Sequence, residues 1–155
     1  DEENDEYEGK HQVHGIPTRG DAATVRKIAL DASEHGCDIA AFLRDEDGDP
    51  NRRAQVEKGI AEALGDGDPD IAIAGSVVVP AIEGWILAHK SVRKTEAMSR
   101  RRAVAKLLAP APVNTAAMVC IVENADPASL PDDARSLLEW RASAEKAFQR
   151  AARTA

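Results

Sequence analysis

The sequence has few aromatic residues, few cysteines and no long apolar run, and each shortage excludes a class of protein. Phe, Trp and Tyr make up 3% of the chain, too few for a sheet that stacks the bases of single-stranded RNA. Cys37 and Cys120 lie too far apart for a CxxC motif, so zinc and thioredoxin-type redox chemistry have no support. No apolar run approaches the roughly 20 residues that span a bilayer, and the acidic N-terminus resembles no signal peptide. The sequence therefore predicts a cytoplasmic protein with two buried thiols and no membrane contact.

The net charge of −7 is concentrated at one end of the chain. Six acidic residues fall within the first eight, DEENDEYE, and the remainder is nearly neutral. That remainder contains one strongly basic segment, opposed only by Glu96: Lys90, Arg93, Lys94, Arg100, Arg101, Arg102 and Lys106. Since Lys and Arg neutralise backbone phosphates, this segment is a candidate contact for nucleic acid; the alternative is a solvated helix face.

Apolar spacing and the placement of Gly and Pro predict alternating helices and strands through the first 95 residues. The predicted elements are, in order, an edge strand at 11–17, a helix at 21–35, a strand at 38–43, a helix opening at Asn51, a strand at 71–79 and a helix carrying Ile82 to His89. Asp21 is the predicted cap of the first helix. Because IAIAGSVVV at 71–79 is apolar on both faces, we expect a parallel strand covered by helices on both sides.

The remainder of the chain is predicted to be mainly helical. AAMVCIVENA after Thr115 favours a helix, with a strand as the alternative, and a last helix follows Pro131. The predicted organisation is an acidic segment at 1–20, an α/β domain at 21–109 and a helical extension at 110–155 packed on the same domain. The order of elements predicts an α/β fold in which a three-layer, Rossmann-like parallel sheet carries a helical C-terminal part.

An acidic turn, RDEDGDP, follows the predicted strand at 38–43. In an extended chain the carboxylates of Asp45 and Asp47 point the same way, at the sheet edge where open α/β proteins bind ligands. Two like charges this close repel unless a proton or a cation lies between them, and Mg²⁺ favours one or two carboxylates with water and phosphate oxygens. The turn therefore predicts a Mg²⁺ site, with Asp49 as a further ligand and Mn²⁺ as the alternative ion. A solvated turn in which Asp45 or Asp49 caps the next helix remains the other interpretation.

Glu83 follows the predicted strand at 71–79 and opens the next helix. The helix dipole favours a carboxylate there, which is sufficient to explain it. Alternatively, Glu83 lies at the same sheet edge as Asp45 and Asp47 and acts as a third metal ligand or as a base that orients water. Trp85 is predicted to be a core residue.

The sequence does not predict a metal site formed by histidines. No two of them have metal-ligand spacing. His35 is predicted to contact the carboxyl end of its own helix, and His89 to lie on the surface at the end of a helix.

The acidic turn partly matches two other known motifs, but neither match is complete. The EF-hand pattern matches at first, but Pro50 occupies the required glycine position and Val56 the position of the bidentate glutamate. The DxDG motif of haloacid-dehalogenase phosphatases resembles DEDGD, but too few residues separate it from GDGDPD for the strands and the lysine of that fold.

The segment AAFLRDEDGD, followed by a helix, resembles the DxD half of the metal site in the Toprim family. VVVPAIEGWILA at 77–88 is similar to a second segment of a Toprim-like group of bacterial proteins associated with phage defence, and so is PDDARSLLEW. The resemblance covers roughly residues 36–145. The family carries a further metal-site glutamate on an N-terminal apolar strand, and no such strand is found before Gly20; the expectation is a strand that was removed or lies on another chain, or an incomplete site.

The resemblance implies a Toprim-like sheet and a Mg²⁺-dependent nuclease, or a related phosphoryl-transfer domain, in phage defence. Asp45, Asp47 and Glu83 would be the catalytic residues. The residues expected to hold phosphate are Lys90, Arg93, Lys94, Arg100 and Arg101. The alternatives are a small-molecule phosphohydrolase and a non-catalytic subunit whose acidic N-terminal segment and helical C-terminal half bind a partner protein or a second copy.

Overall fold

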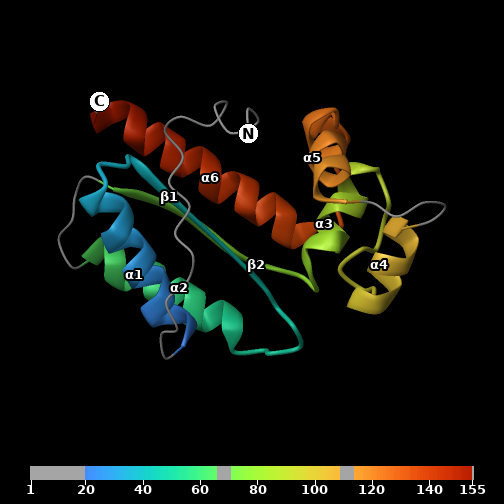
Figure 1. Cartoon of the computed structure of the whole chain (residues 1–155), viewed down its shortest axis with the longest axis horizontal. Helices are drawn as coiled ribbons and strands as arrows, with labels where there is room; N and C mark the ends of the chain where they lie inside the picture. The colour runs from blue at the N-terminus through green and yellow to red at the C-terminus, as the bar shows by residue number, and fades with distance from the viewer. Residues whose placement is uncertain (1–19, 66–70, 109–113, 155) are drawn as a thin grey trace, which may run out of the picture.

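The structure, a computed structural model, describes residues 20–65, 71–108 and 114–154. Its elements are α1 (Asp21–Glu34), β1 (Ile39–Asp45), α2 (Arg52–Gly65), β2 (Ala72–Val78), α3 (Ile82–His89), α4 (Arg100–Leu108), α5 (Thr115–Glu123) and α6 (Arg135–Thr154), as Figure 1 shows. The predicted helices and strands in these ranges are confirmed close to their predicted bounds, and α5 is a helix rather than the alternative strand. The edge strand predicted at 11–17 lies outside the described residues.

The strands β1 and β2 form a parallel sheet, and α2 makes the crossover between them. Their register runs from Ile39 opposite Ala72 to Asp45 opposite Val78. In the described part of the chain this is the whole sheet, so the fold is mixed α/β with two parallel strands.

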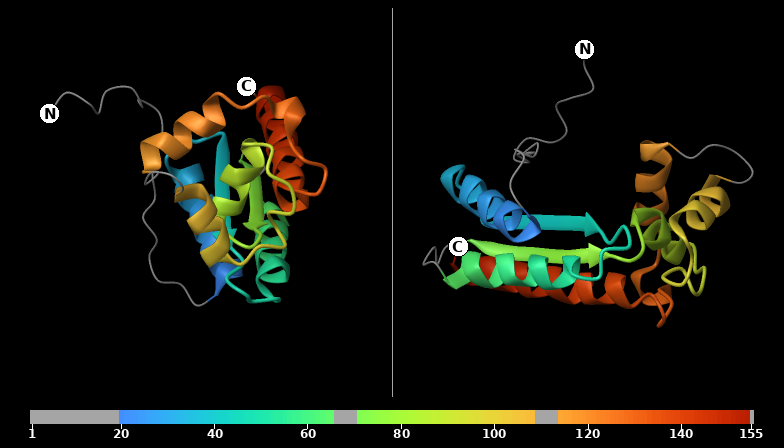
Figure 2. Two further views of the ribbon diagram at one scale, coloured as in Figure 1. Left: turned by 90° about the vertical axis from the view of Figure 1, so that its right-hand side faces the viewer. Right: turned by 90° about the horizontal axis from the view of Figure 1, so that it is seen from below.

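Side chains of β2 alternate between two helical layers, because successive residues of a strand point to opposite faces. Ile73 packs with Ala29 of α1, whereas Ala72 packs with Ala144 of α6. Figure 1 shows α6 along one side of the strands and α1 and α2 on the other, and Figure 2 shows the same helices from two further directions. The prediction that this strand is covered on both faces is therefore confirmed.

The two helices on the first face are in close contact at Gly59 of α2. A Cβ atom there would lie 2.7 Å from the backbone oxygen of Ala22 and 2.9 Å from Cβ of Val25. Because only glycine fits, this residue sets how closely α1 and α2 approach each other.

Among the described residues, those that cover β1 lie mainly on one of its faces. Ala40 and Phe42 are buried against the side of α1 and α2. The alternating residues Ala41 and Leu43 are exposed, with Leu43 at 41%, because α6 packs mainly on β2. One half of the sheet therefore has an apolar face that none of the described helices covers.

Two sequence predictions need correction. Asp21 does not cap α1: Gly20 is the N-cap, and the Asp21 carboxylate instead pairs with Arg44 at 3.4 Å and Arg52 at 3.2 Å.

The prediction of two buried thiols is also wrong. Cys37 is half-buried and Cys120 on α5 is exposed. The reason is that α5 packs on α3 and α4 through Met118 and Ile121, which leaves its other faces open. Over the described ranges, none of the helices combines the length and the apolar character that crossing a membrane requires.

Candidate functional site

The carboxyl ends of the two strands are tied together by the backbone and by Asp45. The N–H of Glu46 donates to the carbonyl of Val78 at 2.9 Å. Oδ1 of Asp45, the last residue of β1, accepts the N–H of Ile82 at 3.0 Å. Asp45 therefore satisfies one of the free N–H groups at the start of α3, so it does cap a helix, although not the one that follows it in sequence.

Three predicted site residues meet around Arg100, the first residue of α4. Nη1 of Arg100 lies 3.4 Å from Oδ1 of Asp47, and its Nε lies 3.9 Å from Oε1 of Glu83. Asp45 is close enough to feel the charges of all three groups. The structure thus brings Asp45, Asp47 and Glu83 together at one edge of the sheet, from β1, the turn after it and the first turn of α3.

The environment of Asp45 disfavours its charged form. Burial raises the pKa of the Asp45 carboxyl above 3.8, and the neighbouring charges of Asp47 and Glu83 raise it further. The hydrogen bond from Ile82 and the charge of Arg100 act in the opposite direction without cancelling the rise. Burial is therefore the main reason that the charged form of Asp45 is disfavoured, and the neighbouring carboxylates add to it.

Arg52, the first residue of α2, holds the acidic turn in place through hydrogen bonds. It was not identified as a site residue from the sequence. Its Nη1 donates to the carbonyls of Asp45 at 2.6 Å and Glu46 at 3.0 Å, and to Oδ2 of Asp47 at 3.2 Å. Its side chain is only 14% exposed. A positive charge in the first turn of a helix interacts unfavourably with the helix dipole. The placement of Arg52 there, directly after an acidic turn, could have predicted that it pairs with the turn.

A depression of about 430 Å³ opens beside the carboxylates of Asp45 and Asp47. This volume accommodates a hydrated cation together with a phosphate group, since one water occupies about 30 Å³. Its lining residues come from the ends of both strands and the start of α3: Leu43, Arg44, Asp45, Asp47, Val78 and Ile82.

Asp49 does not join the cluster. Its Oδ1 accepts the N–H of Asn51 at 2.9 Å, and its carbonyl accepts the N–H of Arg52 at 3.2 Å. It therefore shapes the start of α2, as the capping interpretation expected. Over residues 20–65, 71–108 and 114–154, no three Asp, Glu, His or Cys side chains form a ready-made metal-ligand set.

The basic segment is divided between structural and exposed residues. Arg93 pairs with Asp132 and, at 3.5 Å, with Asp133, which also accepts the N–H of Lys94. These contacts tie the loop after α3 to the segment before α6. Lys90 and Arg101 are exposed, and of the five residues predicted to hold phosphate, Arg100 is the one that pairs with the carboxylates.

Trp85 is a core residue, as predicted. Its side chain is 4% exposed, its Nε1 donates to Oγ of Ser136 at 2.8 Å, and its ring lies 6.0 Å from that of Trp140. This contact joins α3 to α6 and fixes the helix that carries Glu83.

The two histidine predictions have different outcomes. Nδ1 of His35 lies 2.6 Å from the carbonyl of Asp31, which confirms its contact with the end of α1. His89 is half-buried rather than at the surface, and its buried Nδ1 has no hydrogen-bond partner among the described residues. Burial and the charge of Arg141 lower the pKa of His89 below 6.5.

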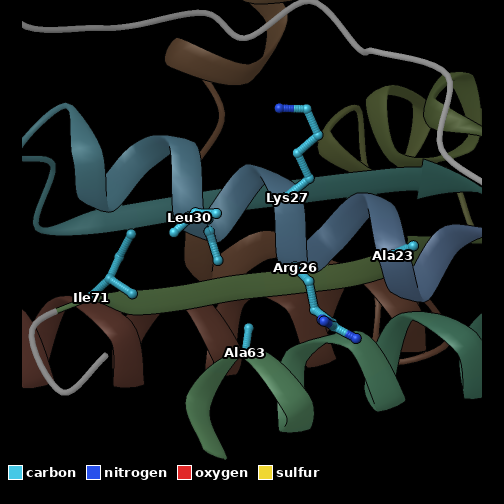
Figure 3. Close-up of a pocket in the computed structure, with 7 residues that line it drawn as sticks. Ala23, Arg26, Lys27, Leu30, Ala63 and Ile71 are labelled. Atoms are coloured by element: carbon cyan, nitrogen blue, oxygen red, sulfur yellow. The ribbon is translucent and has the colours of Figure 1, made fainter. Parts of the chain in front are cut away.

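A second hollow, of about 520 Å³, lies between α1, α2 and the start of β2 (Figure 3). It contains none of the predicted site residues, and its lining is mostly apolar: Ala23, Arg26, Lys27, Ala29, Leu30, Ala63 and Ile71. Its two cations are already paired, Arg26 with Glu62 and Lys27 with Asp31. The carboxyl edge of the sheet is therefore the better candidate for chemistry.

Comparison of the chain with protein-family models, with curated proteins and with solved structures gives no match in any of the three.

Proposed function

We propose that the carboxyl edge of the sheet is a divalent-cation site of the Toprim kind, in a domain that hydrolyses phosphodiester bonds of nucleic acid. The observation that carries the proposal is the convergence of Asp45, Asp47 and Glu83 around Arg100, next to an open depression. Carboxylates that crowd together against mutual repulsion are the donor set that Mg²⁺ and Mn²⁺ prefer. A Rossmann-like sheet wider than two strands, and a role in phage defence, belong to the same proposal.

Asp45 and Asp47 would hold the cation, which supplies charge stabilisation to a phosphoryl oxygen and lowers the pKa of bound water. Glu83 is the remaining carboxylate, and its half-buried position suits it to orient a water molecule rather than to meet bulk solvent. Lys90 and Arg101 are exposed and free to contact phosphates along a bound strand.

Arg100 has a double role in this proposal. In the structure its guanidinium neutralises Asp47 and Glu83, and its side chain is 57% exposed, so it can turn outward at little cost. When a cation takes its place between the carboxylates, the displaced guanidinium becomes available to a phosphate, which Arg recognises well. Arg52 stays fixed by the backbone carbonyls that it supports.

The direct experiment is cleavage of single- and double-stranded DNA and RNA with Mg²⁺ or Mn²⁺. The proposal expects metal-dependent cleavage that Asp47→Asn abolishes while the folded state is retained, because Asp47 is exposed. Asp49→Asn is the matched control, since asparagine keeps the turn hydrogen bond and Asp49 lies outside the cluster. Phosphate release from nucleotides alone would instead indicate a small-molecule phosphohydrolase.

One observation favours a second function, a non-catalytic subunit that binds a protein. The helix α5 is apolar from Ala116 to Val122, yet Val119 and Val122 are 44% and 39% exposed. A helix that is apolar all round is normally buried. Under this alternative no polymer is cleaved, the thermal stability does not respond to Mg²⁺ or Mn²⁺, and Val119→Asp weakens capture of the partner.

A further inference from the structure

In the part of the chain that the structure describes, the outer edge of β1 has no neighbouring strand. The carbonyl of Asp38 accepts the N–H of Ala72 at 2.9 Å, and the N–H of Glu46 donates to Val78. Since every second residue of a strand points its backbone groups the same way, the even-numbered residues of β1 bond to β2. The backbone groups of Ile39, Ala41 and Leu43 therefore point outward, where the described residues supply no strand.

This edge lacks the features that normally block pairing. Soluble proteins protect edge strands with lysine, proline, bulges or inward-pointing charges. Between Ile39 and Leu43 the sequence of β1 is IAAFL, without any of these, and its register with β2 is unbroken. Ala41 and Leu43 also expose their side chains on the face that α6 leaves open.

The sequence of β1 and its flanks is complementary to itself. When two copies pair antiparallel about Ala41, Arg44 lies opposite Asp38 of the second copy, and Leu43 lies opposite Ile39. Phe42 meets the small Ala40 in the same register. Because the residues with outward backbone groups are 39, 41 and 43, this register also places each of them opposite another outward-pointing residue, as an antiparallel ladder requires.

We propose that the free edge of β1 pairs with β1 of a second copy of this chain, in the register centred on Ala41. The dimer would have a continuous sheet in the order β2, β1, β1 and β2, parallel within each copy and antiparallel across the twofold axis. Asp38 and Arg44 are both exposed and lie on the same face, so opposite charges flank the interface at each end. Opposite charges in cross-strand positions stabilise pairing, and like charges oppose it.

Other registers lose this match. When the two strands pair about residue 40 or residue 42 instead of Ala41, Arg44 lies opposite Gly36 or Ala40. In both of these registers Asp38 has no opposite charge across the axis. A shift by one residue places outward backbone groups opposite inward ones, which breaks the ladder. The charge pair therefore selects one register among those that the apolar residues allow.

Sedimentation velocity over a range of concentrations tests the proposal. We expect a reversible dimer, with dissociation constants raised at least about tenfold by Arg44→Asp or Asp38→Arg, because each single change creates two like-charge pairs. The double variant Asp38→Arg/Arg44→Asp restores opposite charges across the axis and should recover dimerisation. Arg101→Asp, an exposed arginine of α4, is the matched control and should dimerise as the unaltered chain does.

A second variant separates pairing from folding. The N–H of Ala41 points outward, so Ala41→Pro removes the two bonds that the copies of Ala41 exchange in the dimer and none of the bonds to β2. Proline is tolerated at such edge positions. We expect a folded monomer. In the unaltered chain, amide exchange at Ile39, Ala41 and Leu43 should slow as protein concentration rises.

A monomer at every concentration would overturn the proposal and would show that the edge is free or covered within one chain. A dimer that survives Ala41→Pro would place the interface elsewhere. Neither result bears on metal binding, so this inference and the proposed function fail independently.

Discussion

The faces of the sheet are formed by apolar side chains and its carboxyl edge by charged ones, although both belong to the same two strands. On the faces, Ile73, Val77 and Ala72 are buried among apolar side chains of three helices. At the edge, within a few residues, Asp45 and Asp47 are surrounded by arginines and by the start of α3.

We therefore expect the apolar faces to determine the stability of the fold and the charged edge to determine binding. Close-packed apolar faces tolerate little change in volume, since the surrounding atoms cannot relax freely. At the edge each charge has more than one neighbour and several side chains are exposed, so substitutions there should alter binding and pH dependence more than folding.

Gly59→Val should destabilise the protein by about 2–3 kcal/mol, because the added side chain meets the backbone of α1 rather than a movable side chain. The free energy of unfolding in urea measures it. Gly65→Ala at the end of α2 is the control, since a Cβ there meets no atom within 4 Å. Equal effects of the two substitutions would show that α1 and α2 are not in close contact.

Ser136→Ala should cost about 1–3 kcal/mol. Ser136 is fully buried and accepts the N–H of Trp85, so its removal leaves a buried donor without a partner. Thermal unfolding measures the loss, and tryptophan fluorescence reports whether Trp85 moves. Ser99→Ala, at the exposed start of α4, should cost less; the reverse order would contradict the role assigned to Ser136.

Asp45→Asn should raise the Tm at neutral pH by about 1–3 °C and weaken cation binding at the same time. Asparagine keeps an acceptor for the N–H of Ile82 but carries no charge. Because folding raises the pKa of Asp45 above 3.8, its contribution to stability is complete below that pH and is lost as pH rises through the folded pKa. The advantage of the variant should therefore disappear in acid, and a constant advantage at every pH would contradict this explanation.

His89 should produce the smallest effect, a gradual loss of stability below pH 6.5. Folding lowers its pKa, so its contribution is present above 6.5 and is lost as pH falls through the folded pKa. His89→Gln should flatten this part of the Tm profile, which thermal unfolding at a series of pH values measures. Identical profiles for His89→Gln and the unaltered chain would assign the acid sensitivity to other groups.

The faces could be predicted from the sequence and the edge only in part. The run IAIAGSVVV is apolar at every position of the strand except Gly75 and Ser76, so its burial follows from composition and length alone. Asp45, Asp47 and Glu83 could be placed at one edge because the carboxyl ends of neighbouring parallel strands meet there.

Pairing among charges could not be predicted in the same way. Asp21 and Arg52 are separated by 31 positions, and nothing in their local sequence shows that they meet at 3.2 Å. The spacing of Asp49 matched that of a ligand, yet a turn hydrogen bond within two residues takes its carboxylate. Long, flexible side chains have several possible partners, and only the fold selects among them.

Calorimetric titration of Mg²⁺ into the unaltered chain, Asp47→Asn and Arg100→Gln distinguishes a cation site at this edge from a cluster of carboxylates held by arginines alone. If the carboxylates at this edge gather a cation in competition with Arg100, the unaltered chain binds one ion, Asp47→Asn binds at least about tenfold more weakly, and Arg100→Gln binds more tightly. Absence of binding to the unaltered chain and to Arg100→Gln, or affinity that Asp47→Asn does not change, would contradict it.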